Sequence, residues 1–243
     1  MMLKINNVRK NFGGVRALDK CSLNVEKGKI IAIIGPNGSG KSTLFNAISR
    51  LIEIDKGNMS IHNKNTANLK DFEVANNGIS RTFQDVRLFS NLTIQDHIEI
   101  ALSTKDESLL ISFFTRKEKR NKEVKEILNL VYLNKPLDTY ATDLSYGQRK
   151  LLDLAVAIAK PHEILLLDEP VAGVNPKLRM EIKNIIRELN KKGATILLIE
   201  HDMNFVMDLV DYIFVMDAGN VIAEGKPRQI QNNKKVLDAY LGE

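Results

Sequence analysis

The chain has 243 residues, of which 44% are hydrophobic and 27% charged, a composition typical of a globular protein and not of a disordered or fibrous one. A formal net charge of +5 favours an anionic partner, such as a nucleotide, a nucleic acid or a membrane face, without choosing among them. The single cysteine, Cys21, excludes an internal disulfide and a cysteine-rich zinc site, and the longest apolar runs fall far short of the roughly 18 residues that span a bilayer.

The first part of the chain predicts a small antiparallel sheet and then a strand, a loop and a helix. Residues 3–12 and 21–28 alternate between apolar and polar and are bounded by turn residues, as strands are. A buried-strand run follows at 29–34, then the glycine-rich stretch "GPNGSGKST", then an amphipathic helix over 43–52. On that helix we expect one apolar face made by Leu44, Ile48, Leu51 and Ile52.

The middle of the chain is helical in period and the last part returns to strands. Helices are predicted over 92–102, 117–133 and 148–160, and we interpret the charged run 115–126 as a solvated helix face, with a nucleic-acid patch as the less favoured alternative. Beyond Pro161 we expect two buried strands, 163–169 and 194–202, separated by a helix. A hairpin over 211–225 and one last helix complete the chain. The pattern predicts an α/β core with a helical insert.

The stretch "GPNGSGKS" matches the phosphate-loop pattern G-x-x-x-x-G-K-[ST] in full, between a predicted strand and a predicted helix. The glycines let backbone N–H groups turn toward phosphate oxygens, and the helix adds the positive end of its dipole. Lys41 is expected against the outer phosphates and the Ser42 hydroxyl on Mg²⁺. The alternative, a glycine-rich turn with a stray lysine, is disfavoured by the flanking elements. The expected nucleotide-binding residues are Gly35, Asn37, Gly38, Ser39, Gly40, Lys41, Ser42 and Thr43.

Polar residues follow two of the predicted buried strands. Asp168 and Glu169 end the run "ILLLDE", and acids at the carboxyl end of a strand are how open α/β sheets place charge at a ligand crevice. We expect Asp168 to hold Mg²⁺ and Glu169 to polarise a water aimed at the γ-phosphate. His201 follows the run "LLIE" and could hydrogen-bond the γ-phosphate or the water. Taken singly, surface acids and a structural histidine are the alternatives.

Two further residues are candidates only in combination with these motifs. Gln84, in "RTFQD", stands where the core gives way to the helical insert, and from there it could reach Mg²⁺ and the attacking water; an ordinary polar loop residue is the alternative. Phe12 precedes the phosphate loop and could stack on adenine, although most such aromatics are packing residues.

The stretch "LSYGQ" supports two compatible interpretations. Ser145 and Gln148 have the S-x-x-Q spacing of a capping box at the start of a helix. A helix N-terminus beside a serine and Gly147 is also an anion site, and its distance along the chain from the phosphate loop indicates that the anion belongs to another subunit.

The order "NFGGVRAL", "GPNGSGKST", "TFQ", "LSYGQ", "LLLDEP" and "EHD" resembles the nucleotide-binding subunit of ATP-binding cassette (ABC) transporters over nearly the whole chain. The resemblance implies an α/β fold of the ABC ATPase type. Its RecA-like P-loop NTPase core, with an N-terminal antiparallel β subdomain, would take residues 1–88 and 161–243. An inserted helical subdomain, 89–160, would carry the signature "LSYGQ". ATP and Mg²⁺ are the implied cofactors, and ATP hydrolysis is the implied activity.

The resemblance also implies partners. In this family two ATP-binding subunits pack head to tail, so Ser145, Gly147 and Gln148 would contact the ATP of a second subunit, either another copy or a sister ATPase. Integral membrane permease subunits would hold the pair at the cytoplasmic side of the cell membrane, as a peripheral protein. No nucleic-acid partner is expected.

Within the family the chain is similar to the LivG type, the ATPases of branched-chain amino-acid importers. The resemblance rests on "YGQ", "AGVNP", "LLIEHDM" and the ending "AYLGE". Tyr146 stands where the signature usually has glycine, and Asn175 stands where the later loop usually has aspartate; both look characteristic of this type. ATPases of lipopolysaccharide export and urea import are the nearby alternatives. A non-transport ABC ATPase of DNA repair or translation is the more distant one.

Overall fold

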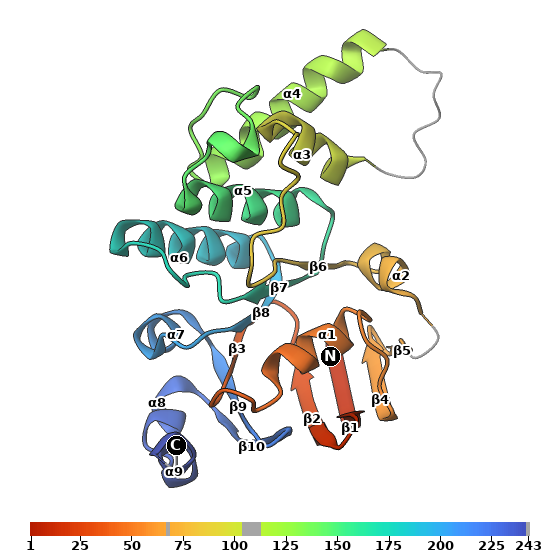
Figure 1. The fold of residues 1–243 in the computed structure, drawn as a ribbon, viewed down its shortest axis with the longest axis vertical. Coiled ribbons are helices and arrows are strands. Elements are labelled where there is room, and N and C mark those ends of the chain that lie inside the picture. Colours follow the sequence, from red (N-terminus) through yellow and green to blue (C-terminus); the bar gives the residue numbers. More distant parts are fainter. Residues whose placement is uncertain (67–68, 104–112, 242–243) are drawn as a thin grey trace. The chain divides into compact units, whose positions relative to one another are not determined.

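The computed structural model describes residues 1–66, 69–103 and 113–241 (Figure 1). The chain forms two compact units. The first comprises residues 1–81, 162–169 and 186–243, and the second comprises residues 82–161 and 170–185. The helical subdomain predicted over 89–160 lies within the second unit.

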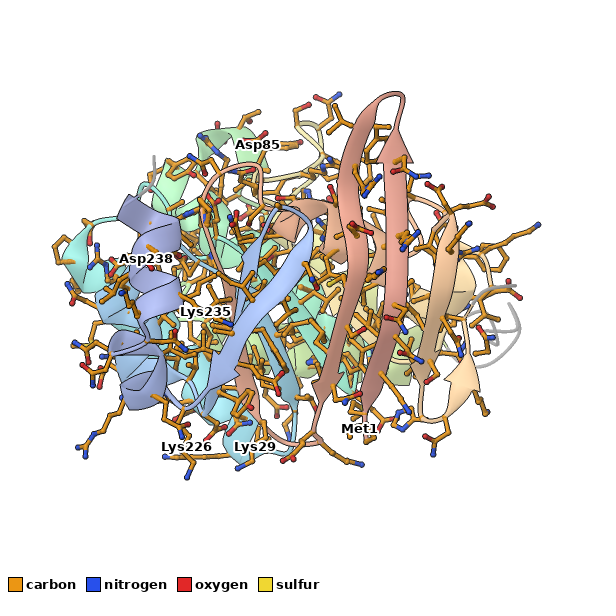
Figure 2. The ribbon with its side chains drawn as sticks, turned by 90° about the horizontal axis from the view of Figure 1, so that it is seen from below. Met1, Lys29, Asp85, Lys226, Lys235 and Asp238 are labelled. Carbon is orange, nitrogen blue, oxygen red and sulfur yellow. The ribbon has the colours of Figure 1, made fainter. Side chains whose placement is uncertain are left out.

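An antiparallel sheet opens the first unit, as predicted. Its four strands, in the order β2-β1-β4-β5, are β1 (Leu3–Phe12), β2 (Val15–Val25), β4 (Lys56–Ile61) and β5 (Lys64–Asn65). The alternation predicted for β1 is present, because Leu3, Ile5 and Val8 are buried while the residues between them are exposed. β2 begins earlier than the predicted 21, because the chain turns already at Gly13, whose φ of 56° suits glycine. In Figure 2 the long strands β1 and β2 run beside the β9–β10 hairpin.

A six-stranded sheet forms the rest of the core of the first unit, and its strands include the three predicted buried runs. Its order, β10-β9-β3-β8-β7-β6, comprises β3 (Ile30–Ile34), β6 (Ile79–Arg81), β7 (Ile164–Asp168), β8 (Thr195–Ile199), β9 (Tyr212–Asp217) and β10 (Asn220–Gly225). All pairings are parallel except the β9–β10 hairpin, which turns at Ala218 and Gly219 as predicted. Every residue of β3, β7 and β8 is buried, which explains why these strands appear in the sequence as unbroken apolar runs.

The helices of the first unit correct two expectations. They are α1 (Lys41–Ile48), α2 (Asp71–Asn76), α7 (Met203–Leu209), α8 (Pro227–Gln231) and α9 (Lys234–Leu241). The helix predicted to reach residue 52 ends at Ile48, since Arg50 has a φ of 56°, and Leu51 is exposed instead of joining the buried face. The predicted last helix is two helices, α8 and α9, separated at Asn232 and Asn233.

Helices predominate in the second unit, as predicted. They are α3 (Ile94–Leu102), α4 (Phe113–Leu130), the short 3₁₀ helix η1 (Ala141–Asp143) and α5 (Tyr146–Ala159); α6 (Pro176–Lys191) begins in this unit and continues into the first. The charged run 115–126 lies on α4, and its side chains before residue 120 are outside the described residues. Within the described ranges, none of the helices combines the length and apolar character needed to cross a membrane.

Candidate active site

Strand order brings three of the predicted motifs to one edge of the parallel sheet. β3 leads into the phosphate loop, β7 ends at Asp168, and β8 ends two residues before His201. These strands are parallel, and β8 lies between β3 and β7. Their carboxyl ends therefore meet at the same edge, where open α/β sheets bind their ligands.

The phosphate loop is held in place by close packing at its glycines. Gly35 and Gly40 have φ of 148° and 99°, and a Cβ at either would collide with a backbone carbonyl oxygen, that of Met216 or that of Ala17. The Gly219 N–H also donates to the Ser39 carbonyl oxygen at 3.0 Å, so the β9–β10 turn braces the loop. The glycines in these two positions are required by both backbone conformation and space.

Lys41 lies across this loop. Its Nζ donates to the carbonyl oxygens of Gly35 and Pro36, both at 2.8 Å, and the residue is 6% exposed. The loop therefore contains a buried ammonium group beside the N-terminus of α1, whose first N–H groups have no intrahelical acceptor. A buried positive charge at the N-terminus of a helix suits a polyphosphate.

The other predicted loop residues differ in exposure. Ser39 is buried at 2%, Thr43 is half-buried, and Asn37, Gly38 and Ser42 are exposed. The Ser42 side chain is thus accessible in the first turn of α1, where the prediction requires a hydroxyl that can reach a cation.

Asp168 lies against a buried arginine. Its Oδ2 accepts from Nη2 of Arg81 at 3.0 Å, and the two side chains are only 5% and 7% exposed. The Arg81 Nη1 also donates to Asn46 Oδ1 at 2.9 Å and to Ser49 Oγ at 3.0 Å, both on α1. Its Cζ lies 5.5 Å from the centre of the Phe45 ring. One guanidinium thus connects the end of β7 with the helix of the phosphate loop.

The donors near Asp168 fit Mg²⁺ better than a transition metal. In the described part of the chain, no group of three or more His, Cys, Asp or Glu side chains could hold a metal ion. A carboxylate and a serine hydroxyl are hard oxygen donors, and a Mg²⁺ ion bound to them keeps several of its waters and binds the phosphates of a substrate.

The predicted catalytic residues Glu169 and His201 are in direct contact. The His201 Nε2 lies 2.9 Å from Glu169 Oε1, with side-chain exposures of 43% and 16%. Glu169 has a φ of 50°, a strained conformation for a non-glycine residue, and its N–H donates to the Ile199 carbonyl oxygen at 3.0 Å. The loop that carries His201 is fixed by the buried Glu200, whose Oε2 accepts from the His201 N–H at 3.0 Å. The strained backbone conformation thus occurs at the residue whose carboxylate contacts the imidazole.

Phe12 ends β1 with its side chain 48% exposed. The Nζ of Lys10 lies 5.3 Å from the centre of its ring, and the same ammonium pairs with Asp55 at 3.2 Å. An exposed aromatic ring flanked by a cation is suited to stacking on a nucleotide base.

Gln84, in the second unit, is exposed, and buried charges lie close to its backbone. The Nζ of Lys150 donates to the Gln84 carbonyl oxygen at 3.3 Å. Asp153, one turn further along α5, is 8% exposed, and burial raises its pKa to about 7 despite the charges of Lys150 and Arg87. These residues tie the segment after β6 to α5 within the same unit.

The stretch "LSYGQ" forms the predicted capping box. Ser145 is the N-cap of α5; its N–H donates to Gln148 Oε1 at 3.0 Å, and its Oγ accepts from the Gln148 N–H at 3.4 Å. A Cβ at Gly147 would come within 2.6 Å of Leu178 Cδ2, so the glycine is closely covered from the side of α6.

The two departures from the usual family pattern have structural roles. The Tyr146 hydroxyl lies 3.5 Å from the Ala172 carbonyl oxygen, and its ring packs beside Gly173. Asn175 accepts from the Leu178 N–H at 2.9 Å and so caps α6, a position where asparagine and aspartate are equally good.

Sequence reasoning missed several residues that support this site. Arg81, Lys150 and Asp153 were not singled out. Arg81 and Lys150 bond partners far away along the chain, and Asp153 is notable only because it is buried. His97, whose sequence context is unremarkable, is 4% exposed; its Nε2 accepts from the Phe89 N–H at 2.9 Å and its Nδ1 lies 2.7 Å from the Thr93 carbonyl oxygen. For Lys150, Asp153 and His97 the available signal was a charged or polar residue inside an apolar helical period, while nothing in the sequence marked Arg81.

A cavity of about 440 Å³ lies in the first unit at the other end of β3 from the phosphate loop. Its lining includes Lys29 and Lys226, both labelled in Figure 2, together with Asp211 and Tyr212. None of the described residues that line it is a predicted nucleotide-binding residue, so the cavity is separate from the candidate site.

Comparison with known proteins agrees with this geometry. The family model described as "ABC transporter" matches residues 18–172, and the model "Branched-chain amino acid ATP-binding cassette transporter" matches residues 220–243. The "Probable branched-chain amino acid transport ATP-binding protein LivG" of Archaeoglobus fulgidus is 39% identical over 99% of this chain and 95% of its own length.

Solved structures are similar over almost the whole chain. A nucleotide-free ATP-binding cassette from an ABC transporter has a TM-score of 0.86 at 37% identity, covering 100% of this chain and 99% of its own. A dimeric cassette in a post-hydrolysis state, bound to ADP and Pi, has a TM-score of 0.83 at 30% identity, covering 93% and 99%. The chain therefore belongs to the ABC transporter family as one of its ATP-binding, ATP-hydrolysing subunits, of the same type as its LivG relatives.

Proposed function

We propose that this ATPase powers the import of branched-chain amino acids, as a peripheral subunit on the cytoplasmic side of the cell membrane. One observation carries the choice of solute. The similarity to LivG extends over 99% of the chain, and the model described for branched-chain amino-acid transporters matches residues 220–243, outside the residues 18–172 that the general ABC transporter model matches. Lipopolysaccharide export, urea import and a non-transport role in DNA repair or translation are the alternatives.

The first unit is proposed to bind ATP and prepare its hydrolysis. Lys41 would exchange its bonds to the carbonyl oxygens of the loop for stronger, charge-assisted bonds to phosphate oxygens. Ser42 and Asp168 would hold Mg²⁺, which when bound supplies positive charge against the phosphates. Phe12 would stack on adenine.

Glu169 and His201 are proposed as the residues that act on the attacking water. The carboxylate of Glu169 would accept a proton from the water as a general base. His201, 2.9 Å from that carboxylate, would hold it in place and donate to the γ-phosphate or the water. The strained backbone at Glu169 supports this role, because such strain clusters at active sites.

A second ATP-binding subunit is proposed to complete each nucleotide site. The N-terminus of α5 would meet the γ-phosphate of the partner's ATP. Ser145 and Gln148 form the capping box there, and Gly147 lies in the first turn of the helix. The dimeric relative bound to ADP and Pi supports the pairing. The helical subdomain 89–160 would carry this signature toward the partner.

The permease subunits are proposed to contact the loop after Gln84. Phe89 is 64% exposed there and Leu88 is half-buried, while the loop backbone is anchored by His97. A large exposed aromatic on an anchored loop suits the docking of a short helix from a membrane protein.

Purification of the chain from its own membranes tests the proposal. We expect it to copurify with polytopic permease subunits, and the reconstituted complex to hydrolyse ATP faster when an external binding protein is loaded with leucine, isoleucine or valine. Stimulation by urea or by a lipopolysaccharide in place of these solutes would replace the proposed substrate. Copurification with ribosomes or DNA, and not with permeases, would refute the transport role.

Glu169→Gln tests the chemistry in the same preparation. Because the amide cannot accept the proton, hydrolysis should slow by roughly 10²–10⁴, the usual range for a general base, while ATP binding is kept. Turnover near that of the unaltered chain would remove Glu169 from this role.

A further inference from the structure

The guanidinium of Arg81 joins three elements of the first unit. Arg81 is the last residue of β6; its Nη2 bonds Asp168 on β7, and its Nη1 bonds Asn46 and Ser49 on α1, all at 2.9–3.0 Å. The arrangement is almost fully buried, with 7% of the arginine side chain exposed. In the sequence Arg81 stands only as the first residue of "RTFQD", the stretch that carries Gln84, and no role was predicted for it.

The contacts of Arg81 fall on the two elements that carry the proposed Mg²⁺ ligands. Asp168 is itself one of those ligands. Ser42, the other one in this unit, stands one turn before Asn46 on α1, and side chains four positions apart lie on the same face of a helix. The arginine therefore binds both the carboxylate and the helix face from which the hydroxyl projects.

Fold stability alone does not account for such a pair. Taking two charges out of water costs free energy, and an apolar pair of equal volume often stabilises a fold as well or better. What a buried arginine offers instead is geometry, since its planar fork can hold a carboxylate on one nitrogen and amide and hydroxyl oxygens on another in fixed relative positions.

We propose that Arg81 is a positioning residue for the Mg²⁺ site, holding the Asp168 carboxylate in register with α1 so that Asp168 and Ser42 ligate one cation together. The inference rests on the proposed function, which assigns Mg²⁺ to these two residues. Arg81 itself touches neither nucleotide nor cation; it acts through Asp168.

Arg81→Lys separates positioning from charge. Lysine keeps the positive charge beside Asp168, so the fold is retained, but its compact ammonium lacks the fork that reaches α1 and β7 together. The Mg²⁺ concentration for half-maximal tightening of ATP binding should rise roughly 10–100-fold, the range seen when the outer partner of a metal ligand is lost. ATP binding without Mg²⁺, which depends on the phosphate loop, should stay as in the unaltered chain.

The double variant Asn46→Ala with Ser49→Ala tests the same positioning role by removing the partners of Arg81 on α1. It leaves the Arg81–Asp168 ion pair intact and removes the bonds between Arg81 and α1, so no buried charge loses its partner. The Mg²⁺ requirement should rise in the same direction and by less. Arg50→Lys, which alters a neighbouring arginine that donates to the Leu69 carbonyl oxygen at 3.0 Å, is the matched control and should leave the requirement unchanged.

Binding of fluorescent ATP, followed across a Mg²⁺ titration, measures these effects apart from turnover. Paramagnetic resonance of Mn²⁺ counts the bound cation directly. Unchanged cation affinity in both Arg81→Lys and the double variant would overturn the positioning role, as would an equal loss of ATP binding with and without Mg²⁺. If Asp168→Asn lowers cation affinity while Arg81→Lys does not, the inference fails and the proposed function stands. If ATP binding by the unaltered chain and by Asp168→Asn is equally indifferent to Mg²⁺, both fail.

Discussion

Replacing Asp153 by asparagine should change how the stability of the protein depends on pH. Asp153 lies on α5, is 8% exposed and faces Lys150 and Arg87. Burial raises the pKa of its carboxyl to about 7 from an ordinary value of 3.8, against the pull of the two cations. Asparagine is nearly the same size and does not titrate, so the variant isolates the proton.

The sign and size of the effect follow from proton linkage. Between about pH 4 and pH 7 the folded chain keeps the Asp153 proton that the unfolded chain releases, so stability falls as pH rises through that window and levels off above it. Each pH unit of the window changes the free energy of unfolding by about 1.4 kcal/mol. Between about pH 4.5 and pH 8, ionisation of the Asp153 carboxyl should therefore lower the free energy of unfolding of the unaltered protein by about 3 kcal/mol. The Asp153→Asn variant should not show this loss.

Urea unfolding of both proteins at about pH 4.5, 6 and 8 measures this difference. The stability of Asp153→Asn relative to the unaltered chain should improve by about 3 kcal/mol between the lowest and highest pH. Asp138→Asn, at an exposed position in the same unit, is the control and should show no comparable trend. A difference between Asp153→Asn and the unaltered chain that stays constant with pH would refute the reasoning, because the carboxyl would then titrate alike in both states.

Two further predictions concern the partners. Phe89→Asp should abolish transport by the assembled complex while the isolated subunit keeps its basal hydrolysis. The residue is 64% exposed, and the loop is anchored by the bond from the Phe89 N–H to His97, which the substitution keeps, although the Phe89 ring also lies 6.0 Å from the His97 ring between centroids. An equal loss of both activities in transport and ATPase assays would instead indicate internal packing. Lys41→Ala and Gly147→Asp should each trap no ATP alone in the presence of vanadate. Mixed head-to-tail dimers should regain one site, because that site combines the unaltered Lys41 of one chain with the intact signature of the other. If mixed dimers trap no more ATP than either variant alone, "LSYGQ" acts only as a helix cap.

Local patterns in the sequence were sufficient for most elements and for the phosphate loop. The strands β3, β7 and β8 are buried on both faces and appear as unbroken apolar runs, and the loop "GPNGSGKS" contains within eight residues all the groups that bind phosphate. The capping box at Ser145 was predictable for the same reason, because its two partners are three residues apart. Boundaries were less predictable: α1 ends at Ile48 because Arg50 adopts a positive φ, which no residue type there demands.

Contacts between distant residues could not be predicted. Arg81 bonds Asp168 across 87 positions, and Lys150 bonds the Gln84 carbonyl oxygen across 66. Arg81 is only a charged residue at the end of a short strand until β6 and β7 are paired, and only then does its guanidinium meet a carboxylate. The parallel order β3-β8-β7 likewise had to be known before His201 could be placed beside Glu169.

The points where the chain passes between its two units bear on how hydrolysis and transport are coupled. Two of the four boundaries follow Arg81, which holds Asp168, and Glu169, which contacts His201. Gln84 and the loop with Phe89 begin directly beyond the first boundary, and the segment 170–175 that packs against Tyr146 begins beyond the second. We therefore predict that a permease which displaces the second unit acts on the backbone next to Arg81 and Glu169. Since the Glu169 backbone is already strained, small changes there would redirect its carboxylate, and this would couple the permease to the proposed role of Glu169 in hydrolysis.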